Sequence, residues 1–222
     1  MSNFTELIQQ EFHRNANNEI AIAQSQYMKN KFSFFGIKSP LRRELQKPFL
    51  VVKYLPSKSD LETIVKTLWL KPQRELHYFT QELVRKYILQ FKKEDIVLFE
   101  FMILNNSWWD SVDFIAVNLV GKYFEMFPSQ RDKYLKKWMN SNNIWLQRTC
   151  LLFQLKYKQQ LDTALLTDLI NKLLGSKEFF INKAIGWVLR EYSKTNPNWV
   201  LDFVNKTDLS NLSRREAIRL LI

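Results

Sequence analysis

The stretch Leu165-Leu166-Thr167-Asp168-Leu169-Ile170-Asn171-Lys172-Leu173 spaces its apolar residues three and four positions apart, as the buried face of an α-helix requires. A second stretch, from Leu61 to Leu68, has the same spacing. No segment alternates convincingly with a period of two, and the chain has only 4 glycines and 6 prolines. The sequence therefore predicts an all-α protein with roughly a dozen helices.

Short signals predict where several of these helices begin. Ser59-Asp60-Leu61-Glu62 fits a capping box, in which side chains satisfy the free N–H groups of the first turn. Ser39-Pro40 and Lys71-Pro72 place proline where a first helical turn accepts it. Ser107 fits a cap for the segment that follows it. At the other end, the sequence stops at Ile222 inside an apparent helix.

Four tyrosines recur at an almost constant interval. Tyr87, Tyr123, Tyr157 and Tyr192 are 36, 34 and 35 residues apart. Helix pairs that repeat at this interval stack into a solenoid, in which each repeat buries its face against its neighbours. Packing between the repeats is the simplest role for the tyrosines. We predict a curved α-solenoid that forms a single domain over residues 1–222.

The chain carries a strong positive charge. Its formal net charge is +11 and its pI is near 9.6, which favours a polyanionic partner, most often nucleic acid. The single cysteine, Cys150, cannot form an internal disulfide, so we expect a reducing compartment. The first residues lack the apolar core of a signal peptide, and the apolar run from Ile96 to Leu104 is too short to span a bilayer. We expect a cytoplasmic protein.

Counting back from the tyrosines compares equivalent positions of the repeats. Ten residues before them stand His77, Asp113, Gln147 and Asn182, and nine before them stand Tyr78, Phe114, Arg148 and Lys183. Such rows inside apolar helices are typical of a ligand-facing wall, although a solvated helix face gives the same pattern. Asp113 is the only acid of the first row, which sets it apart.

The stretch Ser107-Trp108-Trp109-Asp110-Ser111-Val112-Asp113 places an aromatic residue beside an acid. On a helix, Trp109 and Asp113 share one face because they are four residues apart. A carboxylate is repelled by DNA phosphates, but it suits a target that carries positive charge, such as an alkylated base or a sugar that is losing its base. The pair indicates chemistry on damaged nucleic acid.

Several enzyme classes lack the residues that they need. Metal sites need clustered histidine and cysteine, and the chain has only His13, His77 and Cys150, so we expect no metal and no cofactor. It contains neither a glycine-rich phosphate loop nor the motif of a zinc deaminase. The two histidines give no support for a Ser-His-Asp triad. Aromatic side chains, one well-placed acid and many bases remain.

Three stretches connect the chain to a known family: Ser107 to Asp113, Asn143 to Arg148, and Lys183 to Tyr192. From about Phe4 to Leu220 the chain resembles the AlkD-type alkylpurine DNA glycosylases, which are built of HEAT-like helical repeats. The resemblance implies a base excision repair enzyme that hydrolyses the N-glycosidic bond of cationic alkylated purines, notably 3-alkyladenine and 7-alkylguanine. It also implies double-stranded DNA as the partner of a monomer, held on a basic concave surface without a deep pocket for the base.

The resemblance also assigns roles to single residues. Asp113 matches the catalytic acid, and Trp109 and Trp187 match aromatic residues that cradle the deoxyribose of the lesion. Arg148 matches a basic residue of the same site, where it could hold a phosphate or position Asp113. Tyr27 matches an aromatic residue near this site. Ser39 and Arg43 match residues that touch the undamaged strand, beside Lys38, where glutamine is more typical.

Further basic side chains are candidate phosphate contacts, although a solvated surface charge is the simpler role for any one of them. They are Lys156, Lys183, Arg190, Lys194, Arg214 and Arg215. Two other functions fit the chain less well. One is a catalytically silent relative that binds bent or branched DNA, which would share the basic surface. The other is a helical-repeat scaffold for protein partners, which predicts apolar or mixed-charge rows instead of basic and aromatic ones.

Overall fold

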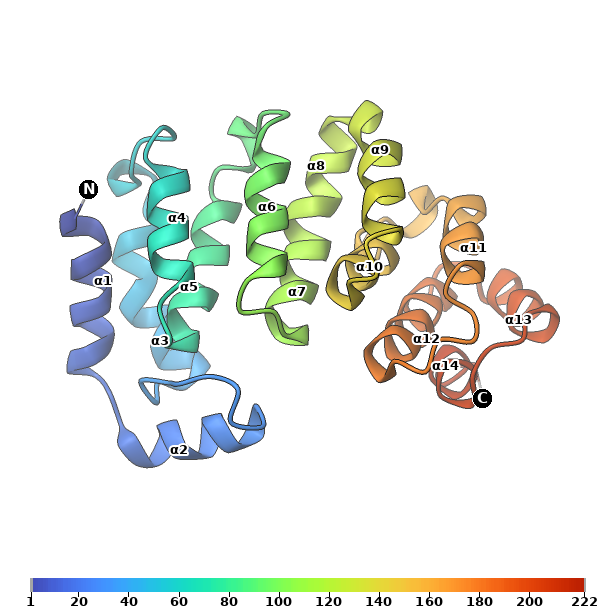
Figure 1. The fold of residues 1–222 in the computed structure, drawn as a ribbon, viewed down its shortest axis with the longest axis horizontal. Helices are drawn as coiled ribbons and strands as arrows, with labels where there is room; N and C mark the ends of the chain where they lie inside the picture. The colour runs from blue at the N-terminus through green and yellow to red at the C-terminus, as the bar shows by residue number, and fades with distance from the viewer. Residues whose placement is uncertain (1, 222) are drawn as a thin grey trace. The chain divides into compact units, whose positions relative to one another are not determined.

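The computed structural model describes residues 2–221 and confirms that they form an all-α protein (Figure 1). Extended backbone in this part of the chain pairs only at an isolated bridge between Ser33 and Gln73. The helix predicted to continue to Ile222 involves a residue outside the described part. The chain forms two compact units that meet in sequence between Lys92 and Lys93. Stacked repeats of one domain can also divide in this way, so the single domain over residues 1–222 stays a prediction.

The first unit contains helices α1 to α5. Their bounds are α1 Ser2–Arg14, α2 Asn18–Tyr27, α3 Ser39–Gln46, α4 Leu61–Trp69 and α5 Arg74–Arg85. Short 3₁₀ turns at Lys47–Leu50, Val52–Tyr54 and Ile88–Gln90 connect some of them. Helix α4 packs against α5, and α1 packs against both α3 and α4. The stripe from Leu61 to Leu68 that predicted α4 is buried in this unit, as its spacing required.

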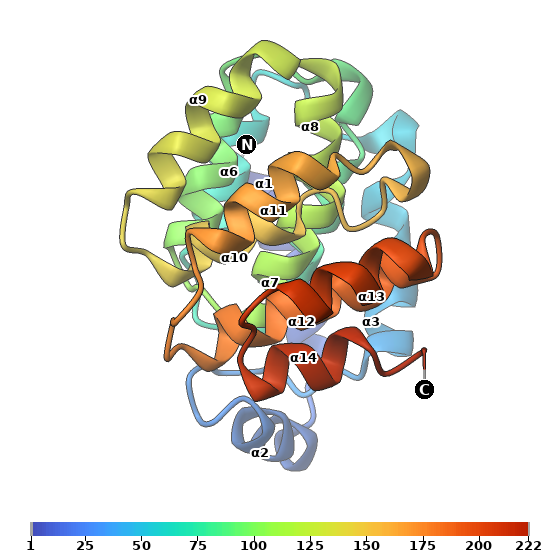
Figure 2. The same ribbon diagram turned by 90° about the vertical axis from the view of Figure 1, so that its right-hand side faces the viewer.

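The second unit contains helices α6 to α14. Their bounds are α6 Asp95–Leu104, α7 Trp109–Ile115, α8 Gly121–Met126, α9 Pro128–Met139, α10 Ile144–Leu152, α11 Thr163–Asn171, α12 Phe179–Ser193, α13 Pro197–Lys206 and α14 Asn211–Ala217. A π-helical segment, Ala116–Val120, joins α7 to α8 without a break. Helix α10 packs against α7 and α12, and α12 packs against α14 (Figure 2). Helices α7, α10, α12 and α14, which we call the inner helices, thus pack one against the next. This is the packing of a helical solenoid.

The repeating tyrosines pack between the repeats. The hydroxyl of Tyr87 donates to the Pro56 carbonyl at 2.6 Å, and that of Tyr123 donates to the Lys93 carbonyl at 2.7 Å. Tyr157 donates to the Gly121 carbonyl at 2.6 Å. The rings of Tyr87 and Tyr123 are buried and that of Tyr157 is half-buried, while each hydroxyl satisfies a backbone carbonyl 30 to 36 residues earlier. In Tyr192 the ring packs edge-to-face on Trp199 instead.

The predicted helix starts were right only in part. Helix α3 begins at Ser39 with proline in its first turn, as predicted. Helix α4 begins at Leu61, but its cap residue Asp60 makes no side-chain capping bond, so the predicted capping box is wrong. The physical reason is a competing turn, because the Ser57 hydroxyl donates to the Asp60 carboxylate at 2.8 Å.

Two other starts were also wrong. Helix α5 begins at Arg74 and not at Pro72, because the backbone N–H of Arg74 donates to the Ser33 carbonyl at 2.9 Å in an extended pairing. Helix α7 begins at Trp109 without a side-chain cap. The Ser107 hydroxyl instead donates back to the Ile103 carbonyl at the end of α6. No helix within residues 2–221 is long and apolar enough to cross a membrane.

Candidate functional site

The predicted catalytic acid lies on a helix that changes its winding. Trp109 is the first residue of α7 and Asp113 follows it one turn later, so both project from one face, as predicted. Three residues after Asp113 the chain enters the π-helical segment Ala116–Val120. Single π-helical turns are rare and occur frequently at functional sites, because the wider turn redirects the side chains on either side.

Asp113 forms a two-pronged ion pair with Arg148 of α10. Arg148 Nε lies 2.6 Å from Asp113 Oδ1, and Arg148 Nη2 lies 2.8 Å from Oδ2. The side chains of Arg148 and Asp113 are only 4% and 13% exposed. This planar match of guanidinium and carboxylate fixes the carboxylate in orientation as well as in position.

Arg148 also connects to α12. Its Nη1 donates to the carbonyl of Phe180 in the first turn of that helix, and its guanidinium carbon lies 5.9 Å from the centre of the Phe180 ring. Every nitrogen of the guanidinium group therefore has a partner within α7 or α12. Of the two roles predicted for Arg148, this geometry favours positioning Asp113 over holding a phosphate.

An aromatic cluster encloses the same junction. The rings of Trp108, Trp145 and Phe180 contact one another, with centroid distances of 5.7 Å, 5.1 Å and 5.0 Å. Trp108 precedes α7, and the other two lie in the first turns of α10 and α12. The cluster thus joins the beginnings of three successive inner helices beside the Asp113–Arg148 pair. Trp145 and Phe180 were not singled out by the sequence.

Two opposing effects act on the Asp113 carboxyl. Burial raises its pKa above the ordinary value of 3.8, and the hydrogen bonds and charge of Arg148 oppose that rise. The nearby carboxylate of Asp110 adds a smaller upward contribution to the pKa. The result is a carboxylate whose pKa lies above that of an ordinary aspartate. Perturbed acids of this kind are candidates for proton transfer and electrostatic catalysis.

The other three residues of the first row make hydrogen bonds within the fold. His77 is fully buried, and its Nε2 lies 2.8 Å from the Lys71 carbonyl. Gln147 donates to the carbonyl of Met139, the last residue of α9, at 3.2 Å, and Asn182 donates to the carbonyl of Ser176, in the loop before α12, at 2.7 Å. His77 is therefore a core residue and not part of a ligand-facing wall, whereas for the half-exposed Gln147 and Asn182 that interpretation stays a prediction. Asp113 differs from the other three because its side chain forms an ion pair, with Arg148 of α10.

The two predicted sugar-binding tryptophans are partly exposed. Trp109 begins α7, and Trp187 lies in the middle of α12. Neither ring contacts another aromatic ring among the described residues, unlike Trp108 and Trp145. The helices that carry them are tied together by Arg148 and Phe180. Their partly exposed faces fit contact with a ligand, which stays a prediction.

Gly186, next to Trp187, allows α12 and α14 to pack closely. A Cβ atom on Gly186 would lie 2.5 Å from the Glu216 Cβ and 2.8 Å from the Ser213 carbonyl oxygen. The close approach seen for this glycine is therefore helix packing, the simpler of the two roles that its sequence position suggests. It brings Glu216, which the sequence analysis missed, against the predicted phosphate contacts of α12.

Both Lys183 and Arg190 pair with Glu216. The Lys183 Nζ lies 2.7 Å from one carboxylate oxygen, and an Arg190 terminal nitrogen lies 2.6 Å from the other. The hydrogen bond and charge of Lys183, followed by the charges of Arg190 and Arg219, hold the pKa of Glu216 below its ordinary value of 4.5. Arg190 and Lys183 lie 26 and 33 residues before Glu216, so no local sequence pattern marks Glu216 as their partner.

The remaining predicted DNA contacts lie on the surface of each unit. In the second unit Lys194 pairs with Glu191 at 2.6 Å, Lys156 approaches Asn118 at 3.3 Å, Arg214 donates to the Thr207 carbonyl, and Arg215 is exposed. In the first unit Tyr27 is 74% exposed at the end of α2. Ser39 and Arg43 are exposed on α3, which follows the exposed Lys38.

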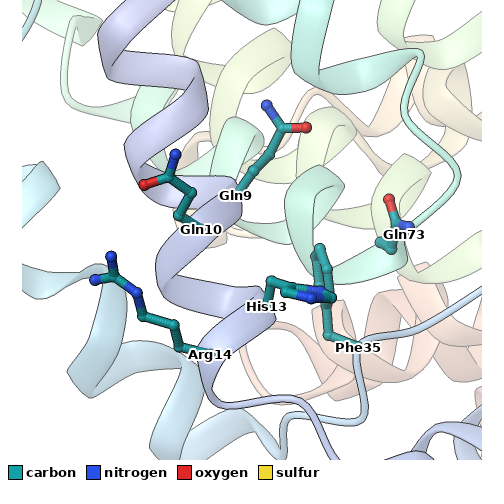
Figure 3. A pocket seen from close by; sticks show the side chains of 6 residues that line it. All are labelled: Gln9, Gln10, His13, Arg14, Phe35 and Gln73. Atoms are coloured by element: carbon teal, nitrogen blue, oxygen red, sulfur yellow. The ribbon is translucent and has the colours of Figure 1, made fainter.

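A separate surface pocket lies in the first unit (Figure 3). It has a volume of about 340 Å³ and is lined by Gln9, Gln10, His13, Arg14, Phe35 and Gln73. It contains none of the predicted site residues. Within residues 2–221 no three His, Cys, Asp or Glu side chains cluster in a way that could hold a metal ion.

Comparison with known proteins places the chain in a family. A family model described as DNA alkylation repair enzyme matches residues 8–221. A solved structure, described as "Predicted DNA alkylation repair enzyme from Enterococcus faecalis", is similar with a TM-score of 0.86 and 33% sequence identity. The match covers 93% of this chain and 96% of that one. No curated protein matches the chain. The chain belongs to the DNA alkylation repair enzyme family.

Proposed function

We propose that the protein is a DNA glycosylase that releases cationic alkylated purines, notably 3-alkyladenine and 7-alkylguanine, from duplex DNA. The observation that carries this proposal is the largely buried Asp113 carboxylate, which Arg148 holds in a fixed orientation one helical turn from the partly exposed Trp109. Membership of a DNA alkylation repair family supports a DNA substrate with alkylation damage. In this proposal the protein acts as a cytoplasmic monomer in base excision repair.

The chemistry follows from the charge of the lesion. Alkylation at N3 or N7 gives the purine a positive charge, so it departs as a neutral base with the electron pair of the N-glycosidic bond. The deoxyribose develops positive charge as this bond stretches. A fixed carboxylate beside the sugar stabilises that charge without reorganising in the transition state. Water then bonds to C1′ and passes a proton to Asp113 or to solvent.

The ion pair leaves Asp113 able to act in this way. A carboxylate offers about four lone-pair positions, and Arg148 occupies one on each oxygen. The remaining lone pairs can accept hydrogen bonds from water. Arg148 in turn spends its donors on Asp113 and on the Phe180 carbonyl. Its proposed role is therefore to orient Asp113.

Trp109 and Trp187 would supply the walls of the sugar site. Indole faces attract cations, and their area keeps bulk water away from the reacting sugar. Both side chains are partly exposed, which supports this role. We propose that the duplex lies along the basic surface that carries these rings and that the lesion does not enter a deep pocket.

The test is release of base from duplex DNA. Wild-type protein should release 7-methylguanine and 3-methyladenine from methylated duplex. It should leave uracil in place, because a neutral base lacks the charge that makes the purine a good leaving group. Tight binding of duplex without release of any methylated base would contradict the glycosylase proposal and favour a silent DNA-binding relative.

A further inference from the structure

Glu216 joins two cations that lie on the helix of Trp187. Its two carboxylate oxygens contact Lys183 at 2.7 Å and Arg190 at 2.6 Å. Lys183 precedes Trp187 by four residues, and Arg190 follows it by three. With about 3.6 residues per turn, the two cations stand about one turn to either side of Trp187. One carboxylate therefore organises both cations that flank this ring.

The position of Glu216 is fixed by its helix. Gly186 lets α14 approach so closely that any Cβ on this residue would overlap the Glu216 side chain and the Ser213 backbone. The Ser213 hydroxyl also donates to the Asn182 carbonyl at 2.8 Å. These contacts hold α14 against α12 at Glu216 and one turn before it, so the carboxylate cannot readily leave its two cations.

Exposure decides which charge an approaching anion would meet. The Glu216 side chain is only 9% exposed, whereas those of Lys183 and Arg190 are 37% and 22% exposed. The acid thus lies behind the two bases. Lysine has three donors and arginine has five, so each cation keeps donors beyond the one that contacts Glu216.

We propose that Glu216 is a positioning residue for a two-cation site that binds the DNA phosphates on either side of Trp187. The inference rests on the proposed function, which places damaged DNA against that ring. Long lysine and arginine side chains lose rotamer freedom when they bind an anion, which weakens the binding. A pair that is already ordered by a buried acid loses less, and an arginine in a fixed geometry binds phosphate with better directed hydrogen bonds.

This role makes a prediction that opposes simple charge counting. Glu216→Gln removes a negative charge near DNA, so charge counting expects tighter binding. If Glu216 positions the two cations, the same substitution should instead weaken DNA binding. The matched control is Glu191→Gln on α12, because Glu191 pairs with Lys194 and the side chains of this pair are 36% and 54% exposed. Both substitutions change the net charge equally.

The experiment measures the affinity of the full chain for an undamaged duplex over a range of salt concentrations. For Glu216→Gln we expect affinity to fall at least about threefold and the salt slope to flatten by roughly one for each phosphate that the variant no longer binds. Glu191→Gln should bind as tightly as wild type or more tightly. Equal or tighter binding by Glu216→Gln would overturn the proposal.

The same substitution in a protein that already lacks both cations distinguishes loss of positioning from general damage to the fold. In the double variant Lys183→Gln, Arg190→Gln, adding Glu216→Gln should change DNA affinity no further, because the side chains that it orders are gone. A decrease in affinity of the same size in that background would overturn the proposal. Thermal unfolding of each variant shows whether α14 still packs.

Base release from methylated duplex, measured on the same proteins, separates this proposal from the glycosylase function. A wild type that binds duplex but releases no base contradicts the function and leaves the phosphate site standing. A wild type that releases base while Glu216→Gln binds as tightly as Glu191→Gln contradicts only the phosphate site.

Discussion

Asp113 and Glu216 are both carboxylates with little exposure and basic partners, yet their pKa values move in opposite directions. Burial raises the pKa of Asp113 despite its pairing with Arg148. Lys183, together with Arg190 and Arg219, lowers the pKa of Glu216. The partners differ as well, because Arg148 is 4% exposed while Lys183 and Arg190 are 37% and 22% exposed.

The opposite pKa shifts show how the surroundings of a carboxylate suit it to a reactive or to a structural role. Asp113 has one buried partner, so the cost of removing its charge from water outweighs the favourable pairing, and it holds its charge less firmly. Glu216 has several cations that keep contact with water, and it stays ionised over a wider pH range. The first arrangement suits a group that must accept a proton or stabilise a passing charge. The second suits a fixed anchor.

The largest expected effect is a loss of excision when Asp113, but not Glu216, loses its charge. Asp113→Asn keeps the shape and removes the charge, so excision of 7-methylguanine should slow by roughly 10²- to 10⁴-fold. DNA affinity should persist or rise, because a negative charge near the phosphates is removed. Single-turnover rates with saturating enzyme measure the first quantity, and equilibrium binding measures the second.

The matched comparison is Glu216→Gln under the same saturating conditions. Its single-turnover rate should stay near that of wild type, because Glu216 acts on binding and not on the reacting sugar. Wild-type excision by Asp113→Asn would remove Asp113 from the mechanism. Thermal unfolding of both variants checks that the measured rates belong to folded protein.

The second-largest effect tests whether Arg148 limits the rise in the pKa of Asp113 that burial causes. Arg148→Lys keeps a positive charge but cannot form the two-pronged pair, so excision should fall about 10- to 100-fold. With weaker support for its ionised form, Asp113 should have a still higher pKa. Activity is lost as pH falls through the pKa of a required carboxylate, so the acid side of the rate profile should move to higher pH.

This shift is measured from single-turnover rates across pH, each corrected for the base loss of the same DNA without enzyme. A lower rate with an unmoved profile would mean that Arg148 serves only the fold. Lys172→Arg is a useful control, since it alters a cation of the exposed pair with Asp168, outside the predicted DNA contacts, and should move neither the rate nor the profile.

The fold was predictable because its signals are local. Stripes such as Leu61 to Leu68 predict helices, and the spacing of Tyr87, Tyr123, Tyr157 and Tyr192 predicts their repetition. The errors came from contacts that the helix-start signals do not include, one between distant residues and one between residues three positions apart. Pairing with Ser33 delays α5 to Arg74, and the turn at Ser57 displaces the expected cap of α4.

The site was predictable only where the repeat singled out one residue. Asp113 stood out because it is the only acid in its row, the four-residue spacing added Trp109, and the resemblance assigned roles to Arg148 and Trp187. Nothing in the sequence showed that Arg148 also binds the Phe180 carbonyl, because the two residues are 32 positions apart. Glu216 has partners just as distant, and only Gly186 hinted at the close packing that places it.

Substitutions at two glycines give a smaller test of the contrast between Asp113 and Glu216. Gly121→Ala would place a Cβ 2.4 Å from the Phe153 carbonyl oxygen at the end of α10, and Gly186→Ala would place one 2.5 Å from the Glu216 Cβ. Each should lower the free energy of unfolding by about 1–3 kcal/mol. Gly121→Ala should also slow excision, and Gly186→Ala should also flatten the salt dependence of DNA binding.

Urea unfolding measures the stability of the two variants, and the assays described for Asp113 and Glu216 measure the rest. The contrast fails if both glycine variants alter excision and salt dependence alike. In that case the two carboxylates would belong to one cooperative site and not to two separate devices.

The smallest expected effect concerns the rings beside the two acids. Trp109→Ala and Trp187→Ala each remove only part of a cation-facing wall, worth about 0.5–2 kcal/mol, so excision should slow by roughly 2- to 30-fold. Trp109→Phe should retain more of the rate, because a phenyl face still attracts a cation. Trp199→Ala serves as the control, since Trp199 stacks on Phe203 and contacts Tyr192 away from the site. It should lower stability and leave the single-turnover rate of folded protein unchanged. If Trp109→Ala and Trp187→Ala behave like Trp199→Ala, the sugar cation is stabilised by Asp113 without an aromatic wall.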